Sequence, residues 1–182
     1  MKTANIMIGF LTALALSACA IHYPPAIRRG EIFDLQFIDT MSAHHQNGIE
    51  MARMAESRAQ HAELKPFARK IVDARESEIG QMKGWREQWY AGMPANVNKG
   101  MPGMEDYESY MSKLSAAAAS EFDFLFINMM TLDHAGTVTM ANEALSKADH
   151  PEIKKLANQI ISEQREDLEQ MSKWRTAWSS TK

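Results

Sequence analysis

Apolar residues recur at intervals of three and four along two long stretches of the chain, residues 32–90 and residues 107–179. This spacing predicts amphipathic helices, because it places the apolar side chains on one face of each helix. Between the stretches lies the segment GMPANVNKGMPGM, whose prolines, glycines and asparagines are typical of a linker. His150-Pro151 has the form of a helix start, so each stretch is expected to contain two helices joined by a short break.

The two helical stretches are copies of each other. Residues 33–89 align with residues 122–178 without a gap, at an offset of 89 positions, and 21 of the 57 aligned residues are identical. A fixed offset over this length indicates an internal duplication. Two antiparallel helical hairpins, each with an apolar face, predict an all-α fold in which the hairpins pack as a four-helix bundle.

The chain begins with MKTANIMIGFLTALALSAC, in which a lysine and an apolar run precede small residues and a cysteine. The apolar run is too short to span a bilayer comfortably, so the pattern predicts a signal peptide. Because LSAC is similar to a bacterial lipobox, residues 1–18 are interpreted as a lipoprotein signal, Cys19 as the lipid-modified residue and residues 19–30 as a tether. The alternative is a free cysteine near an ordinary cleavage site.

Cleavage at this position predicts a periplasmic protein that is attached to the membrane only through the lipid on Cys19. Ala20 after the cysteine favours the outer membrane if the host is Gram-negative. Cys19 is the only cysteine of the chain, so no disulfide is expected within the domain. The domain is predicted to span residues 31–179, with the first repeat at 31–91, a Met-rich linker at 92–104 and the second repeat at 105–179.

Methionine is the unusual feature of the composition. The chain has 14 methionines, of which only Met1 and Met7 lie in the predicted signal. The formal net charge of −3, with mixed charges, gives no case for a nucleic acid partner. Thioether and imidazole are soft to borderline ligands that select Cu(I), and by the same logic Ag(I), over hard ions that prefer oxygen. A metal ion is therefore the first candidate partner.

The candidate ligands lie on the apolar faces of the predicted helices. In the first helix they follow one stripe, and the second copy presents its counterparts in the same way. The first repeat contributes Met41, His44, His45, Met51, Met54 and Met82, the second contributes Met130, His134, Met140 and Met171, and the linker adds Met101 and Met104. Gly48 has no side chain at a point where a neighbouring helix or a bound ion needs room.

The same residues also have a structural interpretation without metal. A methionine stripe at helical spacing is commonly core packing, and a buried histidine is commonly hydrogen-bonded. Glu78 and Asp167 lie on the apolar stripes and are expected to pair with a histidine or an arginine across the bundle. His61 and His150 are expected to cap helix starts, and the four tryptophans to pack in the core and at the bundle ends.

The blocks DTMSAHHQNGIEMARMA and EIGQMKGW, and later SEFDFLFINMMTLDHAGTVTMANEA, resemble the DUF305 domain, a ferritin-like helical family with copper-binding members. The resemblance runs from about Phe33 to Trp178. It implies a ferritin-like bundle and a periplasmic or surface protein that binds Cu(I) or Ag(I), with Cu(II) as a further candidate. The motif positions carried over from the family are Met41, His44, His45, Met51, Met130, His134 and Met140, with Met101 and Met104 in the linker.

The chain departs from the family pattern at Asp133, where the family usually has the first of two adjacent histidines. A carboxylate is a poorer partner for Cu(I) than imidazole, so the second site is expected to be weaker. The other interpretation is that Asp133 orients His134 without touching the metal.

Three functional hypotheses follow. The leading one is a lipid-anchored protein, not an enzyme, that sequesters or carries Cu(I) for metal homeostasis or resistance. A copper-handling protein partner and an oligomer are both compatible with it. A di-iron or di-manganese enzyme of the ferritin class is disfavoured, because no histidine has a glutamate three positions before it. The third hypothesis is a metal-free helical lipoprotein that binds a protein partner. In the leading hypothesis the ligands are Met41, His45 and Met51, with Met130, His134 and Met140.

Overall fold

The computed structural model describes residues 29–102, 104 and 107–179. The predicted signal peptide, Cys19 and all but the end of the tether lie outside these residues. Every regular element in the described part is a helix, which confirms the all-α prediction. The elements are α1 (Arg29–Arg58), α2 (Leu64–Trp89), α3 (Tyr107–Ala116), α4 (Ala119–Lys147) and α5 (Pro151–Ser179). None of these helices combines the length and the apolar character that crossing a membrane requires.

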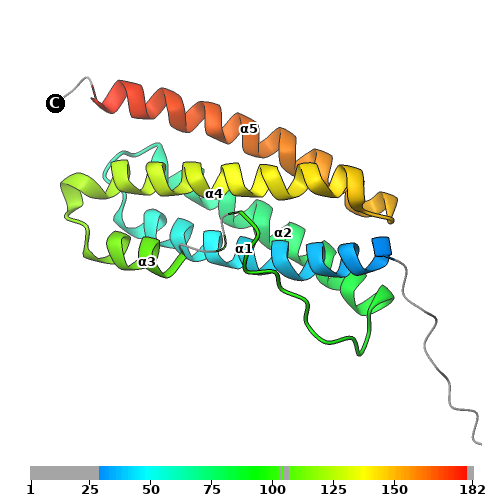
Figure 1. Cartoon of the computed structure of the whole chain (residues 1–182). Helices are drawn as coiled ribbons and strands as arrows, with labels where there is room; N and C mark the ends of the chain where they lie inside the picture. The colour runs from blue at the N-terminus through cyan, green and yellow to red at the C-terminus, as the bar shows by residue number, and fades with distance from the viewer. Residues whose placement is uncertain (1–28, 103, 105–106, 180–182) are drawn as a thin grey trace, which may run out of the picture.

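The four long helices form two antiparallel hairpins, α1 with α2 and α4 with α5 (Figure 1). The hairpins meet mainly along α1 and α4, which run side by side in the middle of the molecule (Figure 1). The short helix α3 packs against α1 and α4 and was not expected as a separate element. The narrower description as a ferritin-like four-helix bundle stays a prediction.

The local sequence explains where the helices begin and end. Pro151 is the first residue of α5, where its missing N–H costs no intrahelical hydrogen bond, and Glu152 adds a favourable charge to the first turn. Beyond the end of α2, Gly92 has a φ of 75°, a left-handed conformation that favours glycine. Pro151 therefore starts the second helix of the α4–α5 hairpin, and Gly92 allows the chain to turn away from α2 into the linker.

The core consists of two hydrophobic clusters, each built from both hairpins. One contains the second half of α1, the first half of α2 and the beginning of α4, with Phe122 and Phe126 fully buried. The other contains the beginning of α1, the end of α4 and the first half of α5, with Phe37 almost fully buried. Burial of each such side chain stabilises the fold by roughly 1.5–3 kcal/mol. The clusters therefore hold the two hairpins together.

At each end of the helices a buried aspartate of one hairpin binds the interhelical turn of the other. The carboxylate of Asp123 accepts hydrogen bonds from the backbone N–H of Gln60 and His61 and lies 2.7 Å from His61 Nδ1. At the other end, Asp34 accepts from the backbone N–H of Asp149 and His150, and its Oδ2 lies 2.6 Å from His150 Nδ1. The side chains of both histidines therefore tie the turns to the opposite hairpin. His61 does not cap α2 as expected, because the N-cap of that helix is Glu63 and has no side-chain cap hydrogen bond.

Two tryptophans complete these end contacts. The His61 ring stacks on Trp178 and the His150 ring stacks on Trp89, both with ring centroids 3.8 Å apart. The members of the two contacts stand 89 positions apart in the chain, as do the two aspartates. The repeat offset of the sequence therefore recurs in the contacts at opposite ends of the molecule.

The linker after α2 is bound along α1. Asp39 accepts a hydrogen bond from the backbone N–H of Asn96, and the Thr40 hydroxyl accepts one from Asn98. Arg86 donates to the carbonyl oxygen atoms of Met93 and Pro94. These contacts press Met101 into the second hydrophobic cluster, where it is almost completely buried.

Candidate metal centre

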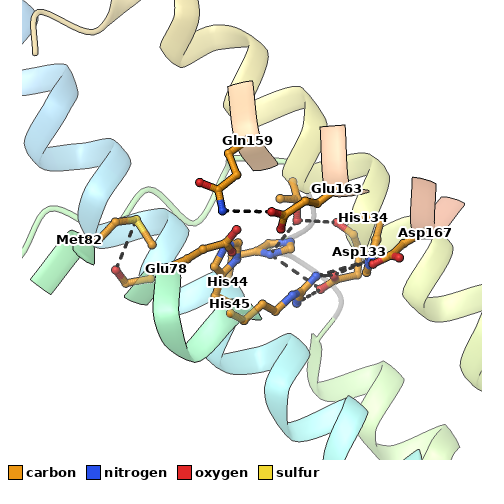
Figure 2. A network of polar contacts seen from close by, with 12 residues as sticks. His44, His45, Glu78, Met82, Asp133, His134, Gln159, Glu163 and Asp167 are labelled. Atoms are coloured by element: carbon orange, nitrogen blue, oxygen red, sulfur yellow. Dashed lines mark hydrogen bonds and ion pairs between the residues drawn. The ribbon is translucent and has the colours of Figure 1, made fainter. Parts of the chain in front are cut away.

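A layer of polar side chains crosses the molecule between the two hydrophobic clusters (Figure 2). His44 and His45 reach it from the middle of α1, and Asp133 and His134 reach it from the middle of α4. Arg75 enters from α2, and all five side chains are buried. Because buried polar groups are costly unless they are paired, the contacts within this layer decide what it can bind.

Each histidine at the repeat-equivalent position faces a carboxylate of its own hairpin. His45 Nε2 lies 2.7 Å from Glu78 Oε2, and His134 Nε2 lies 3.5 Å from Asp167 Oδ2 (Figure 2). Lys70 donates to the other oxygen of Asp167 at 2.7 Å. The expectation that Glu78 and Asp167 pair with a histidine or an arginine is therefore correct in both hairpins.

Arg75 is the central cation of the layer. Its guanidinium forms an ion pair with Asp133, in which Nη1 lies 3.3 Å from Oδ1 and Nη2 contacts Oδ2. Nη2 also lies 3.4 Å from His134 Nδ1. A Cβ atom at Gly48 would collide with this guanidinium, so the glycine makes room for an arginine side chain. The sequence predicted open space at Gly48, and the structure identifies its occupant.

Burial and these charges set the protonation of the layer. Burial lowers the pKa of His44 to about 4, because the charged imidazolium loses its hydration and Arg75 adds a repulsive charge. Burial lowers the pKa of His45 as well, against the opposing effect of Glu78. Burial alone would raise the pKa of Asp133, but Arg75 and His44 together hold it well below the usual range. At neutral pH the two adjacent imidazoles of α1 are therefore neutral, which is the form that binds metals.

Six of the eight buried methionines among the described residues form two groups, one on each side of the polar layer. Met41, Met82 and Met140 belong to one hydrophobic cluster and are called the first sulfur group. The second sulfur group, in the other cluster, consists of Met51, Met130 and Met171. Each group takes two methionines from one hairpin and one from the other, and all six side chains are buried.

A histidine and a carboxylate of the polar layer stand one helical turn from each sulfur group. Met41 precedes His45 by four residues on α1, and Met82 follows Glu78 by four residues on α2. In the second group, Met130 precedes His134 on α4 and Met171 follows Asp167 on α5 with the same spacing. Ser42 and Thr131 donate weak hydrogen bonds to the sulfur atoms of Met82 and Met171, respectively.

This grouping differs from the ligand sets suggested by the sequence. Met41 and Met51 are ten residues apart on one helix, which separates them by about 15 Å along its axis at a rise of 1.5 Å per residue. The side chains of Met41 and Met51 belong to different hydrophobic clusters, on opposite sides of the polar layer. Met51 lies instead with Met130 of the other hairpin, and Met140 lies with Met41.

The remaining candidate methionines lie beside the same two groups. Met101 and Met104 of the linker pack in or against the cluster that contains the first sulfur group. Met54 packs partly buried against the cluster that contains the second. Among the described residues, these linker methionines therefore lie near the first sulfur group and not near the second.

Several imidazole nitrogen atoms of the layer have no hydrogen-bond partner among the described residues. They are Nε2 of His44, Nδ1 and Nε2 of His45, and Nε2 of His134. The Glu78 oxygen near His45 is close in distance but does not meet the angular requirement for a hydrogen bond. The His, Cys, Asp and Glu side chains of the described part form no cluster of three or more that could hold a metal ion. A metal site here would therefore need the thioethers as well.

Arg75 is the member of the centre that the sequence interpretation missed. An arginine is normally exposed, and its residue type therefore argued against burial. Its helical position was the available signal, because Arg75 follows Ile71 by four residues and precedes Glu78 by three, on the buried face of α2. In the second repeat its counterpart is Gln164, which is also buried.

The chain is similar in sequence to one protein family and in fold to several solved structures. The family described as "Domain of unknown function (DUF305)" matches residues 34–175. CopM in its Cu(I)-bound form is 36% identical, with a TM-score of 0.68, over 80% of this chain and 96% of that chain. CopM has also been solved with Cu(II) and with Ag. A putative secreted DUF305 protein from Streptomyces coelicolor is 26% identical, with a TM-score of 0.70, over 78% of this chain and 91% of that chain. No curated protein matches the sequence.

Proposed function

The chain belongs to the DUF305 family, and from this premise we propose that it is an extracytoplasmic protein that binds Cu(I) and Ag(I) through methionine and histidine side chains. It sequesters or carries the ion and is not an enzyme. The proposal includes a ferritin-like four-helix bundle. It also includes attachment of the protein to the membrane through a lipid on Cys19. The likeness to CopM, which has been solved with Cu(I), Cu(II) and Ag, supports copper and silver as the ions, with Cu(II) as a further candidate.

The observation that carries the proposal is the placement of buried thioethers one helical turn from buried imidazoles, each of which has at least one ring nitrogen without a hydrogen bond among the described residues. Soft sulfur with imidazole is a donor set for monovalent copper or silver, whereas hard ions prefer oxygen. We place one ion at the first sulfur group with His45, and one at the second sulfur group with His134. Met101, Met104 and Met54 are additional donors at the edges of these groups, and His44 lies between them.

The low pKa of the α1 histidines favours this function in acid. Burial keeps His44 and His45 neutral below the pH at which an exposed imidazole is protonated. Thioethers do not titrate at all, so the methionines and the two α1 histidines remain available as donors in a mildly acidic compartment. Asp133, a poor partner for Cu(I), is paired with Arg75 and in our proposal is not a ligand.

The test is an anaerobic titration of soluble residues 20–182 with Cu(I) against a chromogenic competitor. One variant carries Met41→Leu/Met82→Leu/Met140→Leu, and a second carries Met51→Leu/Met130→Leu/Met171→Leu. Each is expected to lose about one equivalent of tightly bound Cu(I) and to keep its helicity, because Leu and Met have similar volumes. Met129→Leu is the matched control. It removes a buried thioether of the same hydrophobic cluster, at a position about 100° around α4 from Met130, and is expected to bind as the wild type does.

The outcomes separate the two functional hypotheses. Loss of Cu(I) in the triple variants, with no loss in the Met129→Leu control, supports the proposed sites. Absence of tight binding in the wild-type protein would reject the copper function and leave the metal-free, partner-binding lipoprotein as the better explanation. Binding that is equal in all variants would place the ion elsewhere on the molecule.

A further inference from the structure

The polar centre is not symmetric between the two halves of the molecule. The histidine and carboxylate of each hairpin are kept or conservatively replaced at the repeat offset, as His45 with His134 and Glu78 with Asp167. Three positions at the centre change together. They are His44 against Asp133, Gly48 against Thr137, and Arg75 against Gln164.

These three differences depend on one another physically. Asp133 is a buried carboxylate, and the guanidinium of Arg75 supplies its neutralising charge. The guanidinium fits only because residue 48 has no side chain. On the other hairpin the equivalent residue is Thr137, whose hydroxyl is bound to the carbonyl oxygen of Asp133 at 3.0 Å. The centre therefore contains a built-in cation in one half only.

Two pairs of donor atoms around this cation have spacings close to those between neighbouring ligands of a divalent metal. Asp133 Oδ1 lies 3.7 Å from His44 Nδ1, and Asp133 Oδ2 lies 3.4 Å from His134 Nδ1. A tetrahedral Zn(II) ion with bonds of about 2.0–2.1 Å holds its ligand atoms about 3.4 Å apart, and imidazole and carboxylate are among its usual ligands. Arg75 contacts the carboxylate and lies 3.4 Å from His134 Nδ1. Among the described residues the His, Cys, Asp and Glu side chains form no group of three that could hold a metal ion, so a divalent ion would need both the displacement of Arg75 and a small movement of these donors.

We propose that Arg75 determines metal selectivity by occupying the centre with its own positive charge, so that divalent ions such as Zn(II) do not bind between His44, Asp133 and His134. The biological meaning of this inference rests on the proposed function. When Arg75 keeps divalent ions out of the centre, the sulfur groups are the only tight metal sites, and the protein favours soft monovalent ions. An ion that entered the centre would have to displace the guanidinium from Asp133 and would still be repelled by it.

The test measures Zn(II) binding by calorimetry, because thioethers are poor ligands for Zn(II) and the sulfur groups do not contribute. Arg75→Gln is expected to gain about one equivalent of Zn(II) relative to the wild type, with a Kd at least about tenfold lower. Arg75→Gln/Asp133→His introduces the residues of the opposite half at both positions and removes both buried charges. It is expected to gain the same equivalent, and it carries the test if the single variant does not fold.

The matched control is Lys70→Gln, which removes another positive charge of α2 that is paired with a carboxylate near His134. This variant is expected to bind Zn(II) as the wild type does, because Lys70 does not occupy the centre. If both Arg75 variants are folded by circular dichroism and bind no additional Zn(II), the proposal is overturned. A gain of equal size in Lys70→Gln would also overturn it, since net charge alone would then explain binding.

A measurement on the unmodified protein tests the proposal without any variant. The imidazole NMR resonances of His44 and His134 are expected to stay unchanged when Zn(II) is added to the wild-type chain, and a shift of both at one equivalent would overturn the proposal. Cu(I) titration of the same samples keeps the two proposals separate. Failure of Cu(I) binding would reject the proposed function, whereas the Zn(II) comparison still decides the role of Arg75.

Discussion

The guanidinium of Arg75 occupies the space that a side chain on Gly48 would fill. A Cβ atom at position 48 would lie 2.5 Å from Cζ of Arg75 and 3.3 Å from its Nε, and it would overlap Nη1. Glycine in the middle of a helix costs roughly 1 kcal/mol relative to alanine. The chain carries this cost in α1 because the buried ion pair between α2 and α4 needs the room.

The first prediction concerns Gly48→Ala. The added methyl group pushes Arg75 away from Asp133, so the variant is expected to lose about 1–3 kcal/mol of unfolding free energy, the usual cost of overpacking a core. Gly80→Ala is the matched control, because position 80 also lies inside a helix but a Cβ there meets nothing within 4 Å. That variant is expected to gain up to about 1 kcal/mol. Urea unfolding measures both, and equal stabilisation of the two would contradict the packing at Gly48.

The second prediction concerns the Arg75–Asp133 ion pair. Asp133→Leu leaves a buried guanidinium without its counter-ion and is expected to cost about 3–5 kcal/mol. The double variant Arg75→Met/Asp133→Leu replaces the pair by apolar side chains and is expected to be close to the wild type in stability. Urea unfolding of both variants and of Arg75→Met gives the coupling between the two sites. Additive losses in the double variant would show that the two charges do not depend on each other.

The apolar pattern placed the long helices well but missed α3. The expected start at His150-Pro151 agrees with the first residue of α5. No proline or glycine marks the break between α3 and α4, where Ala118 is extended although alanine favours helix. Arg58 of α1 donates hydrogen bonds to the carbonyl oxygen atoms of Leu114 and Ala117 at this break. The end of α3 is therefore fixed by contacts with a residue more than fifty positions away, and a local sequence pattern cannot predict such contacts.

In the candidate site, too, contacts within one hairpin could be predicted from the sequence, whereas contacts between the hairpins could not. Histidine and carboxylate types at the right helical spacing were enough to anticipate the pairing of Glu78 and Asp167. The composition of the sulfur groups was not accessible, because Met51 and Met140 each pack with the methionines of the opposite hairpin. Spacing along one helix cannot report a neighbour that a second hairpin supplies.

The third prediction concerns the aspartates that bind the interhelical turns. Asp34→Asn and Asp123→Asn each place an amide where a carboxylate accepts two backbone N–H groups and a histidine. Hydrogen bonds to a charged acceptor are worth about 1.5–3 kcal/mol, so each variant is expected to lose about that much stability. The exposed Asp73→Asn is the control and is expected to change stability by less than about 0.5 kcal/mol. Losses as small as in the control would mean that the turns do not need the charge.

The last prediction concerns the acid sensitivity of the metal-free protein. Burial lowers the pKa of His44 to about 4 from an ordinary value of 6.5, so the unfolded chain binds a proton there that the folded chain does not. The stability linked to His44 is therefore complete above pH 6.5 and is lost as the pH falls from 6.5 towards 4. Its contribution approaches about 1.4 kcal/mol per pH unit in that window.

His44→Gln removes this titration and is expected to flatten the dependence of urea unfolding on pH between 6.5 and 4. Part of the slope is expected to remain in the variant, because burial also lowers the pKa of His45. Asp133 does not contribute in this window, since Arg75 holds its pKa well below the usual range and its stabilising charge is lost only in stronger acid. Identical slopes in the wild type and in His44→Gln would mean that His44 is not held neutral by the fold.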